Sequence, residues 1–373
     1  MSLRTQPPFR GDHVGSLLRP PELLKARADF AEGRIKAEDL RAAEDEAIRD
    51  VVKLQENIGL KGITDGEFRR TAWHMDYIYQ IGGIRKSSER TLKLEFHTED
   101  NEVKDFKTPA LEVYEKVRVE NTIFGDAFQF LKGLTKETPK LSIPSPSMVH
   151  YRGGPALIDR NIYPDIEEFW SDLSAAYAEE IQRLHDLGCT YLQLDDTSLA
   201  YLNDPNQRKM VAEWGEDSEH LHLRYIRQVN AALTNRPAGM TVTTHLCRGN
   251  FKSAWISEGG YEFVAEALFG DLNVDGYFLE YDDERAGGFE PLRFVPKNKL
   301  VVLGLVTTRS GTMETKDGLK RRIEEAARYV DIDQLCLSPQ CGAASTVDGN
   351  VLTYDEEVAK LRLVVETAEE VWG

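Results

Sequence analysis

A histidine and a cysteine stand two residues apart at the end of an apolar run, MTVTTHLC, which covers residues 240–247. If this run is a strand, residues i and i+2 point to the same face, so His245 and Cys247 share a face. Imidazole and thiolate are both common metal ligands. The pair is therefore half of a candidate metal site, although a lone pair of this kind can equally pack in a core.

Two further residues of suitable chemistry close other apolar runs. Glu280 ends VDGYFLE, and Cys341 follows LSPQ. With His245 and Cys247 they supply the nitrogen, sulfur and carboxylate oxygen that tetrahedral zinc accepts, and two thiolates favour Zn²⁺ over Mg²⁺ or Ca²⁺. The wide spacing predicts ligands from three separate strand ends. Such a site suits a thiol substrate, whose pKa bound zinc would lower.

Cysteine usage leaves other interpretations open. Four cysteines in 373 residues do not form a disulfide scaffold. Cys341, which precedes Gly342, could be a small buried residue instead of a ligand. For Cys189, which follows a predicted helix, and Cys336, which lies inside a predicted strand, we expect only a structural role.

The order of apolar runs and helical stretches predicts the fold. Amphipathic patterns at 165–188, 316–330 and 355–372 indicate helices between the runs. Alternating strands and helices imply a parallel sheet, and eight such units predict an α/β fold of the TIM (β/α)8 barrel type. The predicted strands lie at 11–20, 59–68, 139–148, 190–198, 240–247, 274–283, 299–309 and 333–342.

One segment interrupts this pattern. Residues 84–138 are polar, with alternating strand-like pieces. They predict an insertion of antiparallel strands between the second and third barrel strands, which could act as a lid, a substrate wall or an oligomer contact. No composition shift marks a linker, so we expect one catalytic domain over 1–373.

Barrel enzymes carry their chemistry at the carboxyl ends of the strands. Polar residues that close the predicted strands should therefore converge on one mouth. The Asp195–Asp196 pair is a good functional candidate there, although it could also cap a helix. The converging residues are His13, Ser16, Asp65, Glu67, Ser145, Ser147, Asp195, Asp196, His245, Cys247, Glu280, Thr307, Thr308, Arg309 and Cys341.

Composition narrows the range of partners. The formal net charge is −17, from 46 basic and 63 acidic residues. This charge argues against nucleic acid or an anionic membrane as the main partner, because both require a basic surface. The sequence has no run of about 18 apolar residues and no secretory leader pattern. We expect a cytoplasmic protein that acts on small molecules and can form a homo-oligomer.

Seven stretches together resemble the cobalamin-independent methionine synthase family. The resemblance covers nearly the whole chain and is strongest for short, single-barrel members, which are similar to the C-terminal catalytic domain of the 5-methyltetrahydropteroyltriglutamate–homocysteine methyltransferases. The stretches are DHVGSLLRP, TDGEFRRTAWHMDYI, YLQLDDTSLAYL, THLCRGNF, FLEYDDERAGGFEPLRF, LGLVTTRSG and LSPQCGAAST.

The resemblance implies roles for particular residues. It implies Zn²⁺ bound by His245, Cys247, Glu280 and Cys341, and a homocysteine thiol on that zinc that is methylated to form methionine. The amino-acid end of homocysteine would be held by Val14 and Ser16, by Glu67 and by Asp195. Two carboxylates suit an α-ammonium group, and backbone amides with a hydroxyl suit an α-carboxylate.

The methyl-donor half of the site departs from the family pattern. The family carries a histidine in a DIHS motif, thought to assist proton transfer to folate, where this chain has TTRS with Thr307 and Arg309. We also expect no second, N-terminal barrel. The donor could therefore be methyltetrahydrofolate, a methylated corrinoid protein or another methylated compound. Asp196, His74 and Arg309 are the candidate proton-transfer residues.

Three rival functions remain. A related zinc thiol alkyltransferase, such as one that adds coenzyme M to an epoxide, would bind a sulfonate that Glu67 and Asp195 should repel. A barrel similar to uroporphyrinogen decarboxylase would not need the candidate zinc set. A non-catalytic zinc-binding protein would bind zinc without letting a thiol displace a ligand.

Overall fold

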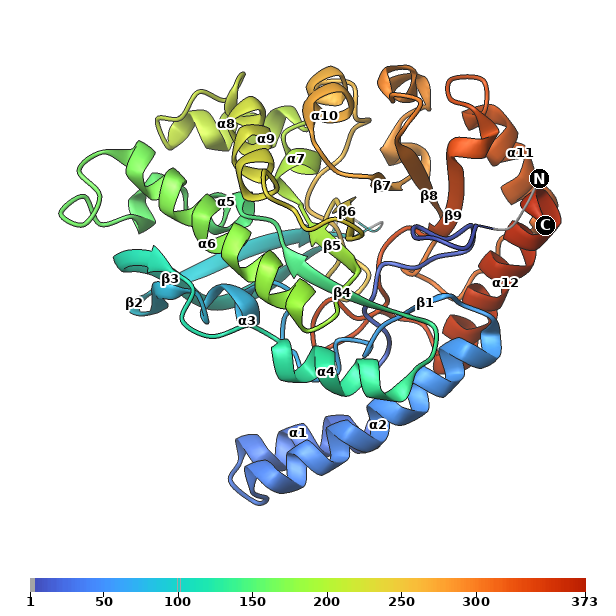
Figure 1. Ribbon diagram of the computed structural model, residues 1–373, viewed down its shortest axis with the longest axis horizontal. Coiled ribbons are helices and arrows are strands. Elements are labelled where there is room, and N and C mark those ends of the chain that lie inside the picture. Colours follow the sequence, from blue (N-terminus) through green and yellow to red (C-terminus); the bar gives the residue numbers. More distant parts are fainter. Residues whose placement is uncertain (1–3, 99, 101) are drawn as a thin grey trace.

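The computed structural model describes residues 4–98, 100 and 102–373. Its main sheet has seven parallel strands in the order β1-β4-β5-β6-β7-β8-β9, and β2 and β3 form a separate antiparallel pair (Figure 1). The strands are β1 Gly62–Ile63, β2 Gly82–His97, β3 Val103–Arg118, β4 Thr138–Pro144, β5 Tyr191–Asp195, β6 Thr241–Leu246, β7 Gly276–Glu280, β8 Leu300–Val306 and β9 Leu335–Pro339.

Helices lie on the outside of the parallel sheet, and α1 and α2 project from one end of the molecule (Figure 1). The α-helices are α1 Pro21–Ala31, α2 Ala37–Ile58, α3 Met75–Ile78, α4 Gly125–Leu134, α5 Ser147–Tyr151, α6 Ile166–Asp186, α7 Ser198–Tyr201, α8 Pro205–Glu213, α9 Leu221–Ala232, α10 Ala265–Asp271, α11 Lys316–Ala326 and α12 Tyr354–Trp372. The 3-10 helices are η1 Gly154–Leu157, η2 Glu284–Ala286, η3 Glu290–Phe294 and η4 Ile332–Gln334.

Local sequence accounts for the helices that the periodicity predicts. The N-cap carboxylate of α6, Asp165, accepts a hydrogen bond from the Glu167 amide. At the start of α12, Thr353 and Glu356 form a capping box. The helices predicted at 165–188, 316–330 and 355–372 are therefore confirmed as α6, α11 and α12.

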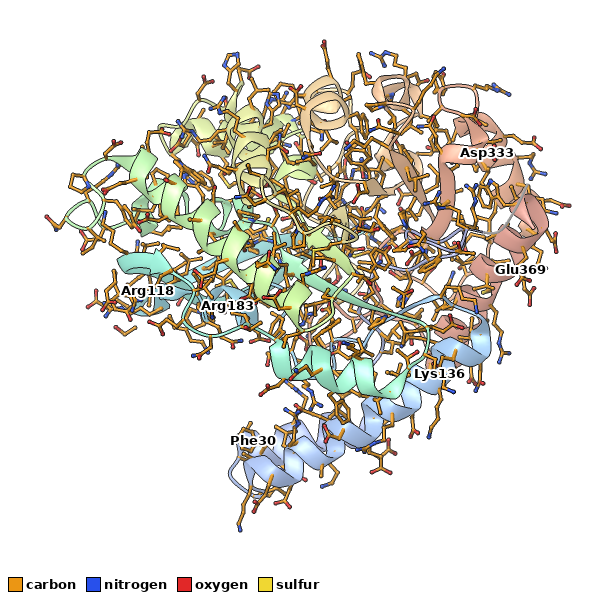
Figure 2. All side chains as sticks on the ribbon, in the orientation of Figure 1. Phe30, Arg118, Lys136, Arg183, Asp333 and Glu369 are labelled. Carbon is orange, nitrogen blue, oxygen red and sulfur yellow. The ribbon has the colours of Figure 1, made fainter. Side chains whose placement is uncertain are left out.

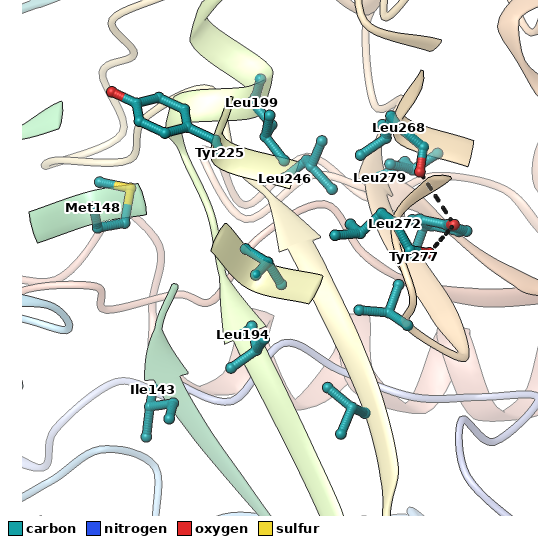
Figure 3. Close-up of a cluster of buried hydrophobic side chains, with 14 of the residues drawn as sticks. Ile143, Met148, Leu194, Leu199, Tyr225, Leu246, Leu268, Leu272, Tyr277 and Leu279 are labelled. Atoms are coloured by element: carbon teal, nitrogen blue, oxygen red, sulfur yellow. Dashed lines mark hydrogen bonds between the residues drawn. The ribbon is translucent and has the colours of Figure 1, made fainter. Parts of the chain in front are cut away.

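Successive side chains of each strand point to opposite faces of the parallel sheet, so the protein has a separate interior on each face. The leucines and isoleucines that face the helices form the main hydrophobic core, and Figure 3 shows Ile143, Leu194, Leu246 and Leu279 from four successive strands in that layer. Each buried aliphatic side chain of this kind contributes about 1.5–3 kcal/mol. Residues of the other parity, such as Gln193, point to the opposite side of the sheet, where the Gln193 amide donates to the carbonyl of Val14.

The first predicted strand, 11–20, is wrong as a strand. Within the described residues it makes one parallel bridge, between Gly11 and Leu337, and the sheet contains seven strands instead of eight. The cause is local: the carboxylate of Asp12 accepts hydrogen bonds from the backbone amides of Phe9 and His13. Because a side chain accepts hydrogen bonds from those two amides, they are not available for the backbone hydrogen bonds of a sheet.

The predicted antiparallel insertion is present with different limits. The β2–β3 hairpin spans Gly82–Arg118, whereas we expected strands over 84–138; the later part of that range forms α4 and the start of β4. The free end of the hairpin docks on the loop that follows β6. There the His97 amide donates to the Trp255 carbonyl at 2.6 Å, and the Trp255 amide donates back at 3.0 Å.

Charged side chains cover the outside of the molecule. Figure 2 labels Arg118, Lys136 and Glu369 among them, and all three are exposed. Within residues 4–98, 100 and 102–373, no helix combines the length and the apolar character needed to cross a membrane.

Candidate metal centre and active site

The four predicted metal ligands lie together at the carboxyl ends of three strands. One ligand atom from each of His245, Cys247, Glu280 and Cys341 lies within 4.8 Å of the others, and all four residues are buried. The two Sγ atoms are 3.5 Å apart, and both cysteines are free thiols. Because β6, β7 and β9 run parallel, residues separated by up to 96 positions in the chain meet at one end of the sheet.

Unsatisfied polar atoms in this cluster fit a bound cation. Both ring nitrogens of His245 and the Oε1 atom of Glu280 are buried and have no hydrogen-bond partner among the described residues. Leaving such atoms without partners costs about 1–3 kcal/mol each, so native structures rarely do it without a ligand. Imidazole nitrogen, two sulfurs and a carboxylate oxygen form a donor set typical of zinc.

The electrostatics of the cluster favour one thiolate. A hydrogen bond from Cys247 and the nearby His245 ring hold the pKa of Cys341 well below its usual value. Burial raises the pKa of Glu280 to about 7, against the opposing charge of Arg309. These contacts favour the deprotonated form of the Cys341 sulfur, which is the form in which cysteine binds metals.

Arg309 lies behind the cluster and does not line the cavity. Its Nη1 atom donates to Asp282 Oδ2 at 2.8 Å, and its Nη2 atom donates to Glu280 Oε2 at 3.3 Å. The amide of Arg248 donates to the same Glu280 oxygen at 3.2 Å. The sequence suggested Arg309 as a proton-transfer residue at the mouth; in the structure one of its charged contacts holds the Glu280 carboxylate and the other holds Asp282, and the proton-transfer role stays a prediction.

A cavity adjoins the metal cluster, and the predicted substrate-binding residues line it. Its walls come from the N-terminal segment, the ends of several strands and the β2–β3 hairpin. The lining residues are Val14, Ser16, Glu67, Trp73, His74, Leu94, Phe96, Phe106, Arg152, Asp195, Thr197, Tyr201, His245, Cys247, Gly249, Asn250, Phe251, Cys341, Ser345 and Thr346.

Two carboxylates form an acidic part of this wall. Glu67 Oε1 accepts from the Ser142 hydroxyl at 2.8 Å and lies 3.4 Å from Arg70, whereas its buried Oε2 has no partner among the described residues. Asp195 accepts from Gln193 at 2.7 Å, and burial raises the pKa of Asp195 to about 7. Free carboxylate oxygen in a closed cavity suits a cationic group such as an ammonium.

The two other proton-transfer candidates differ. Asp196 accepts hydrogen bonds from the hydroxyls of Ser147 and Ser198 and from the amide of Leu199, does not line the cavity, and caps the start of α7. These contacts match the capping alternative, and a catalytic role for Asp196 stays a prediction. His74 does line the cavity, and neither ring nitrogen has a partner among the described residues. Burial, and then the charge of Arg152, hold the pKa of His74 well below its usual value.

Sequence reasoning missed part of the wall. Leu94 and Phe96 from β2 and Phe106 from β3 reach the cavity together with Phe251, so the insertion supplies an aromatic wall. The alternation LKLEF could have shown that the hairpin has one apolar face. Arg152 was also missed, and no motif around it distinguishes it from a surface arginine.

Comparisons with known proteins show which family the chain resembles. Residues 155–370 match the family model described as "Cobalamin-independent synthase, Catalytic domain". The "Uncharacterized protein YxjG" of Bacillus subtilis is 45% identical over 380 residues, which cover 99% of this chain and 96% of that protein. A "Methionine synthase" of Pyrococcus abyssi is 25% identical, over 88% of this chain and 84% of its own.

Solved structures show the same fold. A putative vitamin-B12 independent methionine synthase from Listeria monocytogenes superposes with a TM-score of 0.79 at 37% identity, covering 98% of both chains. A B12-independent methionine synthase from Shewanella sp. W3-18-1, solved in complex with selenomethionine, has a TM-score of 0.71 at 21% identity over 97% of both chains. This chain therefore belongs to the cobalamin-independent synthase family, carries its catalytic domain, and is an enzyme of the methyltransferase class.

Proposed function

We propose that this protein methylates the thiol of homocysteine to form methionine, with Zn²⁺ held by His245, Cys247, Glu280 and Cys341. The observation that carries the proposal is the convergence of those four ligand atoms within 4.8 Å of one another, beside a cavity that His245, Cys247 and Cys341 line. Two of the proteins to which the chain is similar, from Pyrococcus abyssi and Listeria monocytogenes, are named as a methionine synthase and a putative methionine synthase, which supports the same substrate.

The residues around the cavity have separate tasks in this proposal. Zn²⁺ bound by the four ligands would lower the pKa of the substrate thiol and keep the sulfur nucleophilic. Glu67 and Asp195 bind the α-ammonium group, since Glu67 Oε2 has no other partner among the described residues. The Ser16 hydroxyl and the backbone at Val14 bind the α-carboxylate.

The other side chains of the cavity wall exclude water and contact the methyl donor. The side chains of Phe96, Phe106 and Phe251 cover the cavity on the hairpin side. His74 is placed to hydrogen-bond the methyl donor, because it lines the cavity and neither ring nitrogen has a partner among the described residues. Burial lowers its pKa and so favours the neutral ring, in which one nitrogen can accept a hydrogen bond while the other donates.

Other thiol alkyltransferases remain the alternative function. A sulfonate thiol such as coenzyme M would place a negative charge in a cavity that contains Glu67 and Asp195, which repel it. An amino-acid thiol carries the ammonium group that these carboxylates need. A non-catalytic role is disfavoured, because the chain belongs to a family of enzymes.

We also infer that residues 10–13 occupy the position of the eighth barrel strand. The amide of Asp12 donates to the Leu337 carbonyl, and the amide of Leu337 donates to the Arg10 carbonyl. On the other side the His13 ring lies 3.0 Å from the Gly62 carbonyl of β1. The segment thus spans the gap between the two edge strands, as closure of a (β/α)8 barrel requires.

The test is a zinc-edge X-ray absorption spectrum of the purified protein with and without L-homocysteine. We expect a shell with two sulfurs that gains a third when the thiol is added. Unchanged sulfur coordination would remove homocysteine as the zinc-bound substrate, and a protein that binds no zinc would overturn the ligand assignment. Turnover with methyltetrahydrofolate and with a methylated corrinoid then identifies the donor.

A further inference from the structure

Arg152 is a charged residue in the cavity wall that none of the roles above uses. It follows α5, and only 4% of its surface is exposed. Thr197 and Tyr201 line the cavity beside it, and its guanidinium lies 5.9 Å from the centre of the Tyr201 ring. Arg152 therefore brings a positive charge into a closed space.

The hydrogen bonding of this guanidinium is incomplete. Its one side-chain hydrogen bond runs from Nη2 to Thr197 Oγ1 at 3.3 Å, and Nε is buried without an acceptor in the described part of the chain. It forms no ion pair with any described Asp or Glu. By contrast, Arg309 pairs with Asp282 and Glu280, and Arg70 pairs with Glu67.

A buried charge without a counter-charge is costly, so a partner from outside the chain is expected. Guanidinium presents a planar fork of N–H donors that matches a carboxylate in two-point contact. Arg152 is the one arginine or lysine among the described residues that line the cavity. In the proposed function the substrate's ammonium group occupies the acidic wall at Glu67 and Asp195, which leaves Arg152 for an anionic group.

We propose that Arg152 is a carboxylate-binding residue of this active site, taking a carboxylate of a bound substrate in two-point contact. The inference rests on the proposed function and adds a charged contact to the neutral ones at Ser16 and Val14. Two substrates can supply the carboxylate: the thiol amino acid, through its α-carboxylate, or the methyl donor, through an acidic side group.

Binding measurements on R152M separate these sources. Isothermal titration on the zinc-loaded protein uses three probes: L-homocysteine, 3-aminopropane-1-thiol, which lacks the carboxylate, and 5-methyltetrahydrofolate. Loss of a charge-assisted contact should weaken binding about 10- to 100-fold. The matched control is R10M, which removes a buried guanidinium whose acceptors are the carbonyls of Asp333 and Leu335 outside the cavity.

Two results support the proposal. If the α-carboxylate is the ligand, R152M loses affinity for L-homocysteine and no longer prefers it over 3-aminopropane-1-thiol. If the donor supplies the carboxylate, R152M keeps its homocysteine affinity and loses affinity for 5-methyltetrahydrofolate. R10M keeps the affinity of the unsubstituted protein for all three probes.

Unchanged affinity of R152M for both L-homocysteine and 5-methyltetrahydrofolate, with zinc content retained, overturns the proposal. Should R152M fail to fold, R152K replaces it, because lysine keeps the charge but not the two-point fork. Unchanged affinities of the R152K protein for the same two probes would also contradict the proposal. Neither result changes the outcome expected from the zinc-edge spectrum. Failure of this inference is therefore distinguishable from failure of the proposed function.

Discussion

Two buried polar regions lie inside the same sheet and differ in one respect. Near its amino-terminal side, Asp12, Lys140 and Tyr191 are packed together with almost no exposed surface. At the carboxyl end, His245, Glu280 and Glu67 are buried to the same degree. In the first region both Asp12 oxygens are saturated, by the amides of Phe9 and His13, by Lys140 at 3.3 Å and by Tyr191 at 2.8 Å.

The second region leaves ligand-type atoms without partners. Both His245 nitrogens, one Glu280 oxygen and one Glu67 oxygen have none among the described residues. Burial of polar groups is therefore not what identifies the active site, since both regions have it. What distinguishes it is that several ligand-type atoms without partners gather at one place, because such a cluster can be satisfied together by a bound ligand.

The largest expected effect comes from removing a metal ligand. Cys247→Ala and Cys341→Ala should each lower zinc affinity by more than the about 10- to 100-fold that loss of a group behind a ligand costs, and should abolish methyl transfer. Zinc content by atomic emission, together with turnover, measures both effects. Cys189→Ala is the matched control, because Cys189 is equally buried but outside the cluster. Stoichiometric zinc in either ligand variant would contradict the assignment.

Breaking the saturated region should act on stability alone. Lys140→Met leaves the Asp12 carboxylate buried without its cation and should cost about 3–5 kcal/mol in the free energy of unfolding. Urea unfolding measures that loss, and the folded variant should keep its zinc. Asp12→Asn combined with Lys140→Met should recover part of the loss. A single variant as stable as the unsubstituted protein would show that the two regions do not differ as described.

Glu67→Gln tests the region at the carboxyl end, where we expect a substitution to change substrate binding and not stability. The amide keeps the volume and can still contact Ser142, so stability and zinc content should hardly change. Homocysteine should bind about 10- to 100-fold more weakly, because a charge-assisted contact to its ammonium is lost. Titration calorimetry measures the affinity, with Glu180→Gln as a control carboxylate whose partner is the Ile123 amide. Unchanged affinity removes Glu67 from the substrate site.

The last prediction concerns a carboxyl group that accepts from a single donor, and its effect appears only as a change with pH. Burial raises the pKa of Glu357 from 4.5 to about 8, opposed by the hydrogen bond from the Leu18 amide. The folded chain therefore keeps a proton that the unfolded chain has released, so this contribution to stability is full below pH 4.5 and is lost as pH rises to about 8. Relative to Glu357→Gln, the unsubstituted protein should lose about 1 kcal/mol per pH unit between about pH 5 and pH 8. Urea unfolding at several pH values measures this slope. If the free energies of unfolding of the two proteins change in parallel with pH, the prediction is wrong.

Regular features of the chain were predictable from sequence. Helical periodicity located α6, α11 and α12, and apolar runs located most of the parallel strands. The convergence of His245, Cys247, Glu280 and Cys341 followed from one rule, that parallel strands bring their carboxyl ends to one edge. Only residue types at strand ends were needed for that prediction.

Features that depend on a particular contact were not predictable. The segment 11–20 has an apolar run, yet the Asp12 carboxylate engages the backbone amides beside it. Arg309 occupies a strand end like the ligands, but Asp282 and Glu280 hold it behind the cluster. The role of Arg152 depends on the absence of a counter-charge in three dimensions, which no local pattern encodes.

The pairing of Gly11 with Leu337 has a consequence for biosynthesis. Val14 and Ser16, near one end of the chain, reach the cavity only when the segment beside them docks on β9, and Cys341 follows β9 directly. Loop closure over more than 300 residues is slow compared with local helix formation. A nascent chain that has emerged from the ribosome only as far as β7 therefore contains His245, Cys247 and Glu280, but Cys341 and the docked Val14 and Ser16 complete the site together, in the last steps of folding.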